Sequence, residues 1–577
     1  MKSTMNIKGW AITAFSMAFL TLQSSVFTSC SDMLDTDSEL VEFEDDNTLN
    51  HLTDSVYSVM GIVNAMQQIA DRVVLFGEVR GDLMTVTPAA SQDLQNLSNF
   101  KFDGKNKYNQ VSDYYAVINN CNYFLAHIDT TLQRRGRPVF MPEYAAVKSF
   151  RAWIYLQLAL AYGEVPLILK PLMTEKEAHE ALTLPRVGLT EICQTFIDDL
   201  TPLVGVQLPD YGLIGDYSSR RLFIPMRLLL GDLCLYSGRY NDAVHWYHEY
   251  LNDKTEPVVL SSSRPQWPNT TNYTIPDRLV VLYADVYIPM EQMVFNGTVS
   301  QLPNLYNSTE QNRYYYELTP STALRQLSAA QRYVTELKVA GATKADTIYA
   351  PRTGLAKSEY VGDLRFASNY SYSKMGNKDE YSEYSLEYQS ITKVARDAII
   401  TYTSPMTYLR YAEALNRAGY PQSAMVVLKY GVCQENFTAY VDTLEQKKAG
   451  QNIYFDPQYF KLNDTDGKRI AYGIHSYGCG DAHADTTYTL PLPPTALATR
   501  QDTIDYQIPL VEDMIIDEMA LEGAFAGNRF NDLMRVALRR NDPSYLANKV
   551  ARRSGTVDAA LQTLLLNKKN WFLPLPQ

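Results

Sequence analysis

Apolar side chains at helical spacing recur in three separate segments, and this periodicity constrains the fold of the chain more than any other feature. Residues 143–162 place apolar residues three and four positions apart and are followed by a glycine, which predicts one amphipathic helix. Residues 225–251 and 406–430 each show the pattern twice, on either side of Gly238 and Gly419. Each of these two segments is therefore expected to form a helical hairpin that buries one face.

Small residues near the two glycines predict that the paired helices approach each other closely. Ala243 follows Gly238, and Ala424 follows Gly419, with four residues between them in both cases, as in tetratricopeptide units. No roughly 34-residue period links the two copies, so the pattern supports helix pairs but not a repeat array. The chain has 577 residues, of which 46% are hydrophobic and 20% charged, which predicts more than one packed lobe. The fold class is predicted to be mainly α.

Residues 255–400 interrupt the helical pattern with a long irregular stretch rich in Pro, Ser, Thr, Asn and Tyr. The chain contains 42 Tyr against 20 Phe and 5 Trp, so its aromatic content is dominated by tyrosine. Aromatic faces stack on the apolar C–H face of sugar rings, while neighbouring polar groups bind the hydroxyls. Long loops on a rigid scaffold commonly carry binding groups, although any single tyrosine more often only packs.

The N-terminus has the layout of an export signal. Two lysines precede the apolar run Trp10–Leu22, which is shorter than the roughly 18 apolar residues of a transmembrane helix. The run leads to Phe27-Thr28-Ser29-Cys30, which resembles the lipobox of bacterial lipoproteins, with Phe27 where Leu, Val or Ile is usual. Residues 1–29 are therefore predicted to be a lipoprotein signal peptide and Cys30 the lipid anchor; an ordinary signal peptide cut elsewhere is the alternative.

An acidic segment, residues 30–50, follows the cysteine and contains no Lys or Arg. Its eight acids are Asp32, Asp35, Asp37, Glu39, Glu42, Glu44, Asp45 and Asp46. Such a run repels itself and predicts an extended tether. Acids directly after the cysteine resemble the signal that sends Bacteroidetes lipoproteins to the outer face of the outer membrane. The formal charge of −12 disfavours binding to phosphate backbones, so no nucleic acid partner is expected.

The remaining cysteines and the histidines predict neither a disulfide framework nor a metal site. The five cysteines are odd in number and stand mostly in apolar helical context: Cys121, Cys193, Cys234, Cys433 and Cys479. His475, Cys479, His483 and Asp485 are residue types that bind zinc, but structural zinc sites usually contain closer pairs such as C-x2-C. The sequence also contains no phosphate-binding or dinucleotide-binding motif, so no cofactor is predicted.

Ordered motifs along the predicted mature chain resemble the SusD/RagB family, outer-surface nutrient-binding lipoproteins of Bacteroidetes. The motifs are Cys30–Asp35, Arg80-Gly81-Asp82, Tyr115–Asn122, Phe150-Arg151-Ala152, Tyr162–Ile168, Glu522–Arg535 and Trp571–Pro576. The two helical hairpins fall where the family has tetratricopeptide-like pairs. Met519 and Ala526 depart from the family pattern, where Arg and Glu are usual, in a motif that packs helices.

The resemblance implies a SusD-like helical scaffold, with an N-terminal helical part at residues 51–254, a ligand-binding loop-rich region at 255–400 and a C-terminal helical part at 401–577. It also implies a function. Such proteins are similar to lids on a SusC-type TonB-dependent outer-membrane barrel, to which they deliver an oligosaccharide without altering it. By position, the resemblance implies ligand contacts from Asp82, Asn96, Asn99, Trp267, Tyr273, Tyr283, Tyr306 and Tyr314.

Two alternatives stay open on the sequence alone. A peptide instead of a glycan is a possible ligand for the same fold. A secreted glycoside hydrolase needs two carboxylates about 5 to 9.5 Å apart, and a chain with 64 acids neither excludes such a pair nor points to one.

Overall fold

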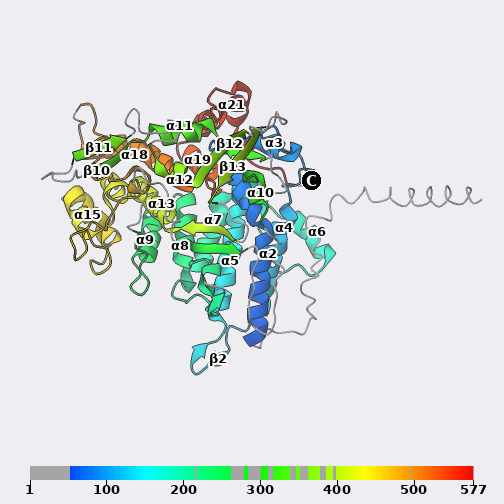
Figure 1. The fold of residues 1–577 in the computed structure, drawn as a ribbon. Helices are drawn as coiled ribbons and strands as arrows, with labels where there is room; N and C mark the ends of the chain where they lie inside the picture. Colours follow the sequence, from blue (N-terminus) through cyan, green and yellow to red (C-terminus); the bar gives the residue numbers. More distant parts are fainter. Residues whose placement is uncertain are drawn as a thin grey trace, which may run out of the picture.

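The protein is a mainly helical scaffold with small two-stranded sheets, which confirms the predicted fold class (Figure 1). The computed structural model describes residues 52–214, 217–261, 278–283, 300–308, 316–337, 346–350, 362–376, 385–393, 398–495 and 497–575. The predicted signal peptide, Cys30 and the acidic segment lie outside these residues. No helix in the described ranges is both long and apolar enough to span a bilayer.

The helices form a first group, a few short members in the middle and a second group. The first group is α2 (Leu52–Val79), α3 (Gln92–Ser98), α4 (Val111–His127), α5 (Met141–Tyr162), α6 (Glu175–Leu182), α7 (Leu189–Leu200), α8 (Met226–Tyr236) and α9 (Tyr240–Leu251). The middle members are α10 (Leu302–Tyr306), α11 (Thr322–Ala330) and α12 (Leu364–Asn369). The second group is α13 (Ser404–Arg417), α14 (Pro421–Met425), the π-helical turn η4 (Val426–Tyr430), α15 (Gln434–Tyr440), α16 (Thr443–Ala449), α17 (Ser476–Cys479), α18 (Arg500–Gly523), α19 (Arg529–Arg539), α20 (Pro543–Ala551) and α21 (Ala559–Leu565).

All described strand pairs are antiparallel. They are β1 (Met84–Val86) with β9 (Leu318–Pro320), β2 (Gln133–Arg134) with β3 (Arg137–Pro138), β4 (Val165–Pro166) with β5 (Arg186–Val187), β6 (Leu213–Ile214) with β7 (Tyr217–Ser218), β8 (Arg278–Tyr283) with β14 (Ala398–Thr403), β10 (Tyr333–Leu337) with β11 (Asp346–Ala350), and β12 (Tyr370–Gly376) with β13 (Ser385–Ile391). Most of the longer strands fall in residues 255–400, between the two helical groups.

The helix predicted at residues 143–162 is α5, and the prediction is confirmed. Nearly every α5 side chain is buried, because α2, α4, α7 and α8 all pack against it. The helix ends at Gly163, whose φ of +79° is a backbone conformation that favours glycine. Phe572 packs directly on this turn, and the backbone N–H of Leu573 donates to the carbonyl of Ala161 at 2.9 Å. The C-terminal end of the chain therefore closes against α5.

Both predicted helical hairpins are also confirmed. α8 and α9 reverse at Gly238, and α13 and α14 reverse at Gly419, with φ of +80° and +92°. α8 and α9 approach each other closely at Gly231, where a Cβ atom would lie 2.6 Å from the ring of Tyr247. A side chain at position 231 would therefore force the two helices apart.

The motif Tyr115–Asn122 on α4 holds the segment that follows α5. The hydroxyl of Tyr115 donates to the carbonyl of Pro166 at 2.9 Å, and the amide of Asn122 donates to the carbonyl of Ile168 at 3.0 Å. Arg151 of α5 donates to the side-chain oxygen of Asn122 at 2.9 Å. These buried bonds satisfy backbone groups of an irregular segment, which explains why polar residues stand on a buried helix face.

One continuous core joins the two helical groups. Buried apolar residues from Val59 to Leu573 form a single cluster, and α2 packs against α4, α5 and α19. The five cysteines predicted to be core residues are buried and free of disulfides.

Candidate functional site

A pocket of about 200 Å³ lies between the segment after α9, the start of α13 and the long connection before α17. It is lined by Val259, Leu260, Tyr408, Val432, Tyr459, Phe460, Lys461, Ile470, Ala471 and Tyr472. We call these residues the aromatic pocket. Its volume approaches the lower limit of ligand pockets, roughly 300 Å³.

The pocket has a fixed aromatic base and two partly open aromatic walls. Tyr408 and Phe460 are buried, and the Tyr408 hydroxyl donates to the carbonyl of Val258 at 2.6 Å. Burial raises the pKa of Tyr408 well above its ordinary value, so the phenol stays protonated and keeps donating this bond. Tyr459 and Tyr472 are half-buried, so each contributes packing to the core and part of its surface to the pocket.

Glycine residues bring the pocket wall against the π-helical turn η4. A Cβ atom on Gly431 would lie 2.5 Å from the backbone of Ala471, and one on Gly473 would lie 2.3 Å from the carbonyl oxygen of Leu428. The backbone N–H groups of Ile474 and His475 donate to the carbonyls of Val427 and Leu428 at 3.1 and 2.9 Å. Because this contact is between backbones, residues 470–473 are rigidly placed relative to η4.

The other end of the same connection is tied to α9. The Nε2 atom of His248 lies 2.6 Å from the carbonyl oxygen of Tyr454, and the side-chain amide of Asn252 donates to the same oxygen at 3.1 Å. The outer turn of the connection is closed by Asp464, whose carboxylate accepts backbone N–H bonds from Asp466 and Lys468 at 3.0 and 2.7 Å. The connection that carries Tyr459 and Tyr472 is thus held at both ends and at its tip.

The composition of the aromatic pocket suits binding better than covalent chemistry. Its lining contains four aromatic and five aliphatic side chains, and Lys461 is its one charged group among the described residues. Aromatic faces at the edge of a pocket bind flat apolar surfaces, such as the C–H face of a sugar ring. General acid–base catalysis needs a titratable pair within hydrogen-bond reach of the substrate, and no carboxylate or histidine is among the described lining residues.

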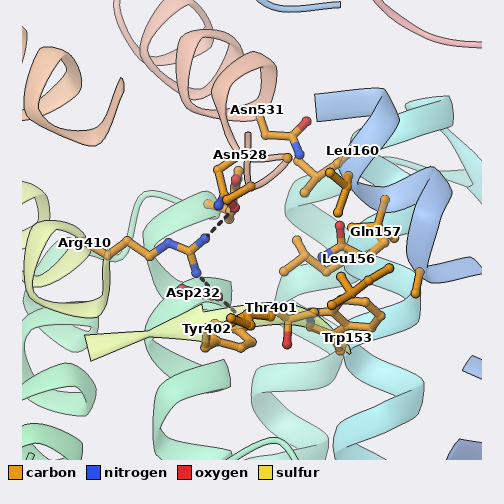
Figure 2. Close-up of a pocket in the computed structure, with 18 residues that line it drawn as sticks. Trp153, Leu156, Gln157, Leu160, Asp232, Thr401, Tyr402, Arg410, Asn528 and Asn531 are labelled. Carbon is orange, nitrogen blue, oxygen red and sulfur yellow. Dashed lines mark hydrogen bonds and ion pairs between the residues drawn. The ribbon is translucent and has the colours of Figure 1, made fainter. Parts of the chain in front are cut away.

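A second cavity lies deeper, between α2, α5, α8, β14 and α13 (Figure 2). Its volume is about 40 Å³, which gives room for a few water molecules but not for a sugar. Arg410 pairs with Asp232 at 2.7 Å on one side and donates to Asn528 at 3.1 Å on the other, as Figure 2 shows. Tyr402 and Tyr247 donate their hydroxyls to the same Asp232 carboxylate at 2.7 and 2.5 Å. This cavity therefore belongs to a buried ionic network that joins α8 to α13.

Asp82, the first of the residues implied to contact ligand, is a core residue in the structure. It is 5% exposed, and Arg529 of α19 holds its carboxylate with bonds of 2.6 and 3.0 Å. Burial acts to raise the pKa of Asp82, but the Arg529 guanidinium outweighs burial and the pKa lies below its ordinary value. Contact between Asp82 and a ligand would require this part of the core to open.

Asn96, Asn99 and Tyr306 lie near the β1–β9 strand pair. Helix α3, with Asn96 and the adjoining Asn99, contacts β1, and α10, with Tyr306, contacts β9. Asn96 of α3 is half-buried and accepts a bond from Gln92 at 2.9 Å. Asn99 directly follows α3 and accepts a bond from Arg553 at 3.3 Å. Tyr306 of α10 is 0% exposed, so its ring packs the core and does not form part of the described surface.

The other implied contacts are described only in part. Tyr283 is the last residue of β8 and pairs with Ala398 of β14. Trp267, Tyr273 and Tyr314 lie outside the described residues.

The sequence did not predict the residues of the aromatic pocket, because they come from three distant parts of the chain. Val259 and Leu260 fall inside the predicted ligand-binding region, whereas Tyr408, Tyr459 and Tyr472 fall in the predicted C-terminal helical part. One signal was present: Phe455, Tyr459, Phe460 and Tyr472 make residues 455–472 rich in aromatic side chains.

Three of the four residues considered for zinc have separate partners. His475 lies 2.8 Å from Glu518, Cys479 lies 3.6 Å from Asp363, and the Asp485 carboxylate accepts bonds from Thr487. No group of three or more potential ligands is placed to hold a metal in the part of the chain that the structure describes.

Solved structures with the same fold come from Bacteroides species. A SusD superfamily protein from Bacteroides vulgatus matches with a TM-score of 0.54 and 12% identity, over 92% of this chain and 96% of that chain. A SusD-like carbohydrate-binding protein from Bacteroides fragilis matches with a TM-score of 0.51 and 12% identity, over 86% and 88%. A SusD-like protein from Bacteroides fragilis matches with a TM-score of 0.50 and 15% identity, over 86% and 88%. No protein-family model and no curated protein matches the sequence.

Proposed function

From its SusD-like fold, we propose that this protein is a surface glycan-binding lipoprotein that captures an oligosaccharide and passes it to a SusC-type TonB-dependent barrel in the outer membrane. The observation that carries the proposal is an open aromatic pocket on a fold shared with a carbohydrate-binding protein. The protein binds its ligand without altering it.

The aromatic pocket is the proposed place where a sugar ring stacks. Tyr459 and Tyr472 offer partly exposed faces, and the buried residues Tyr408 and Phe460 hold the pocket open from below. Trp267 and Tyr273 follow the wall residue Leu260 closely in the sequence, and they stay proposed contacts together with Tyr283 and Tyr314. Asn96, half-buried on α3, is a proposed polar contact at a different part of the surface.

Calorimetry with a panel of plant and host oligosaccharides tests the proposal. We expect saturable binding of at least one glycan and no binding of peptides of similar mass. Binding of peptides alone would replace the glycan proposal with a peptide-binding one. Release of reducing sugar in proportion to the amount of purified protein would instead identify an enzyme.

The membrane anchor and the barrel partner need separate experiments. Cys30→Ala removes the proposed acylation site, so we expect the variant to leave the membrane fraction. A variant that stays in that fraction contradicts the anchor. Purification of the native protein from detergent extracts is expected to bring down a large β-barrel protein, and its consistent absence counts against the lid.

A further inference from the structure

The hairpin formed by β2 and β3 extends from the body of the protein and has an unusual charge. In Figure 1 it lies at the end of the molecule farthest from α21. Arg134 and Arg137 face each other in the strand pair, and Arg135 stands in the two-residue turn between them. All three arginines are exposed. Three positive charges within four residues stand out on a chain with a formal charge of −12.

No carboxylate in the described part of the chain pairs with these arginines. The nearest acid in the sequence is Asp129, whose Oδ1 accepts bonds from the N–H and hydroxyl of Thr131 at 2.8 and 2.6 Å. Exposed Leu132 lies beside the arginines, at the base of the hairpin. The guanidinium groups are therefore turned toward solvent and can meet an external anion.

The turn holds an arginine in a backbone conformation that it disfavours. Arg135 has a φ of +54° and Gly136 a φ of +74°, the signs of a type I′ turn. Asn, Asp or Gly is preferred at the first of these positions, because a larger L-residue is strained there. Arg135 therefore contributes its charge to the hairpin and not a good fit to the turn.

The hairpin lies at the end of the molecule where α2 begins. Arg72, near the C-terminal end of α2, donates to the carbonyl of Gln110 at 3.0 Å and pairs with Asp113, both at the start of α4. From there α4 packs along α2 and leads into the hairpin, close to the N-terminal end of α2. Figure 1 shows the start of α2 and the hairpin at the same end.

We propose that this arginine hairpin docks on the phosphate groups of an anionic membrane surface and orients the protein on it. The inference rests on the proposed anchor at Cys30, because the segment from Cys30 enters the fold at Leu52, at the same end as the hairpin. Guanidinium groups bind phosphate oxygens in pairs of parallel hydrogen bonds, and basic groups near an anionic surface each add to binding.

Sedimentation with lipid vesicles tests the proposal. The mature chain with Cys30→Ala is mixed with phosphatidylcholine vesicles that contain or lack phosphatidylglycerol. We expect partition only onto the anionic vesicles, weakened by salt. The triple variant Arg134→Gln, Arg135→Asn and Arg137→Gln is expected to bind on the order of 100-fold more weakly, because each arginine near an anionic surface contributes about fivefold. Asn is chosen at position 135 because it tolerates the turn.

A matched control removes the same charge elsewhere. Lys101, Lys447 and Lys448 are exposed and lie outside the hairpin. Their joint change to Gln should leave vesicle binding within about twofold, since only charges close to the surface contribute. Equal losses in both triple variants would overturn the proposal, because net charge alone would then explain the binding.

The acidic segment of the same chain is the competing occupant. Binding to anionic vesicles could appear only after the eight acids of residues 30–50 are changed to amides. In that case the arginine hairpin binds the acidic segment of its own chain and not the membrane, and the proposal is wrong. Glycan calorimetry on the arginine variant separates this inference from the proposed function. Unchanged glycan affinity is expected, and a failure of vesicle binding would leave the glycan proposal standing.

Discussion

The carboxylate of Asp82 and the guanidinium of Arg529 form a bidentate ion pair, with oxygen–nitrogen distances of 2.6 and 3.0 Å. The pair joins the segment after α2 to the first residue of α19, and Arg529 also donates to the carbonyl of Ile516 at 2.9 Å. The N-terminal and C-terminal parts of the chain are thus fastened together at a buried charge pair.

Asp82→Ala is expected to destabilise the protein by about 3–5 kcal/mol, because it leaves the Arg529 charge buried without its partner. Urea denaturation measures the loss. Asp242→Ala, which removes the exposed partner of Arg239, is the control and should cost less than about 1 kcal/mol. An Asp82→Ala protein of normal stability that has lost glycan affinity would instead assign the residue to the ligand site.

Glu78 is expected to make stability depend on pH. Burial raises its pKa to about 7 from an ordinary 4.5, and the N–H of Gly527 and nearby cations offset this only in part. The folded state therefore holds the proton more tightly than the unfolded state. Stability from this group is fully present below pH 4.5 and is lost as the pH rises to about 7.

Denaturation of the wild type and Glu78→Gln at pH 5 and pH 8 checks this expectation. At about 1.4 kcal/mol per pKa unit, the wild type should lose on the order of 3 kcal/mol more than Glu78→Gln between the two values. The amide does not titrate, but it can still accept the bond from Gly527. Equal pH dependence in the two proteins would contradict the raised pKa.

Tyr459→Ala and Tyr472→Ala are each expected to weaken glycan binding. An aromatic contact contributes roughly 0.5–1.5 kcal/mol, so each variant should bind about 3- to 10-fold more weakly in calorimetry. Tyr454→Ala is the control, because Tyr454 is 44% exposed on the same connection but does not line the pocket. Unchanged affinity in both pocket variants, with a control that also binds normally, would move the ligand site elsewhere.

Gly431→Ala is expected to distort the aromatic pocket. The new Cβ would lie 2.5 Å from the backbone of Ala471, so we expect a loss of about 1–3 kcal/mol in stability together with weaker glycan binding. Gly467→Ala is the matched control, because Gly467 also has a positive φ of +75°, but a Cβ atom at this position would meet no other group within 4 Å among the described residues. If both variants lose the same stability, backbone strain and not the close contact is the cause.

Much of the scaffold could be predicted from local patterns. α5 and the two hairpins at Gly238 and Gly419 were predicted because amphipathic spacing and a following glycine are properties of short segments. The SusD-like fold was predicted from ordered motifs, and the solved structures confirm it. The signal peptide, the anchor at Cys30 and the barrel partner stay predictions.

The candidate site could not be predicted in the same way. Val259, Tyr408 and Tyr472 line one pocket although long stretches of sequence separate them. Spacing along the sequence therefore does not predict that these residues lie together. Asp82 and Tyr306 show the same limit. Their residue types suit ligand binding, yet the structure places one in an ion pair and the other fully inside the core.

The sequence by itself determined that the chain is mainly helical and where its helices turn, because these properties depend on neighbouring residues. Only the tertiary structure decided which tyrosines face a pocket, which carboxylates are neutralised in the core and which arginines remain turned to solvent. Burial and charge partners are set by segments that are distant in sequence, so they exist only once the core has closed.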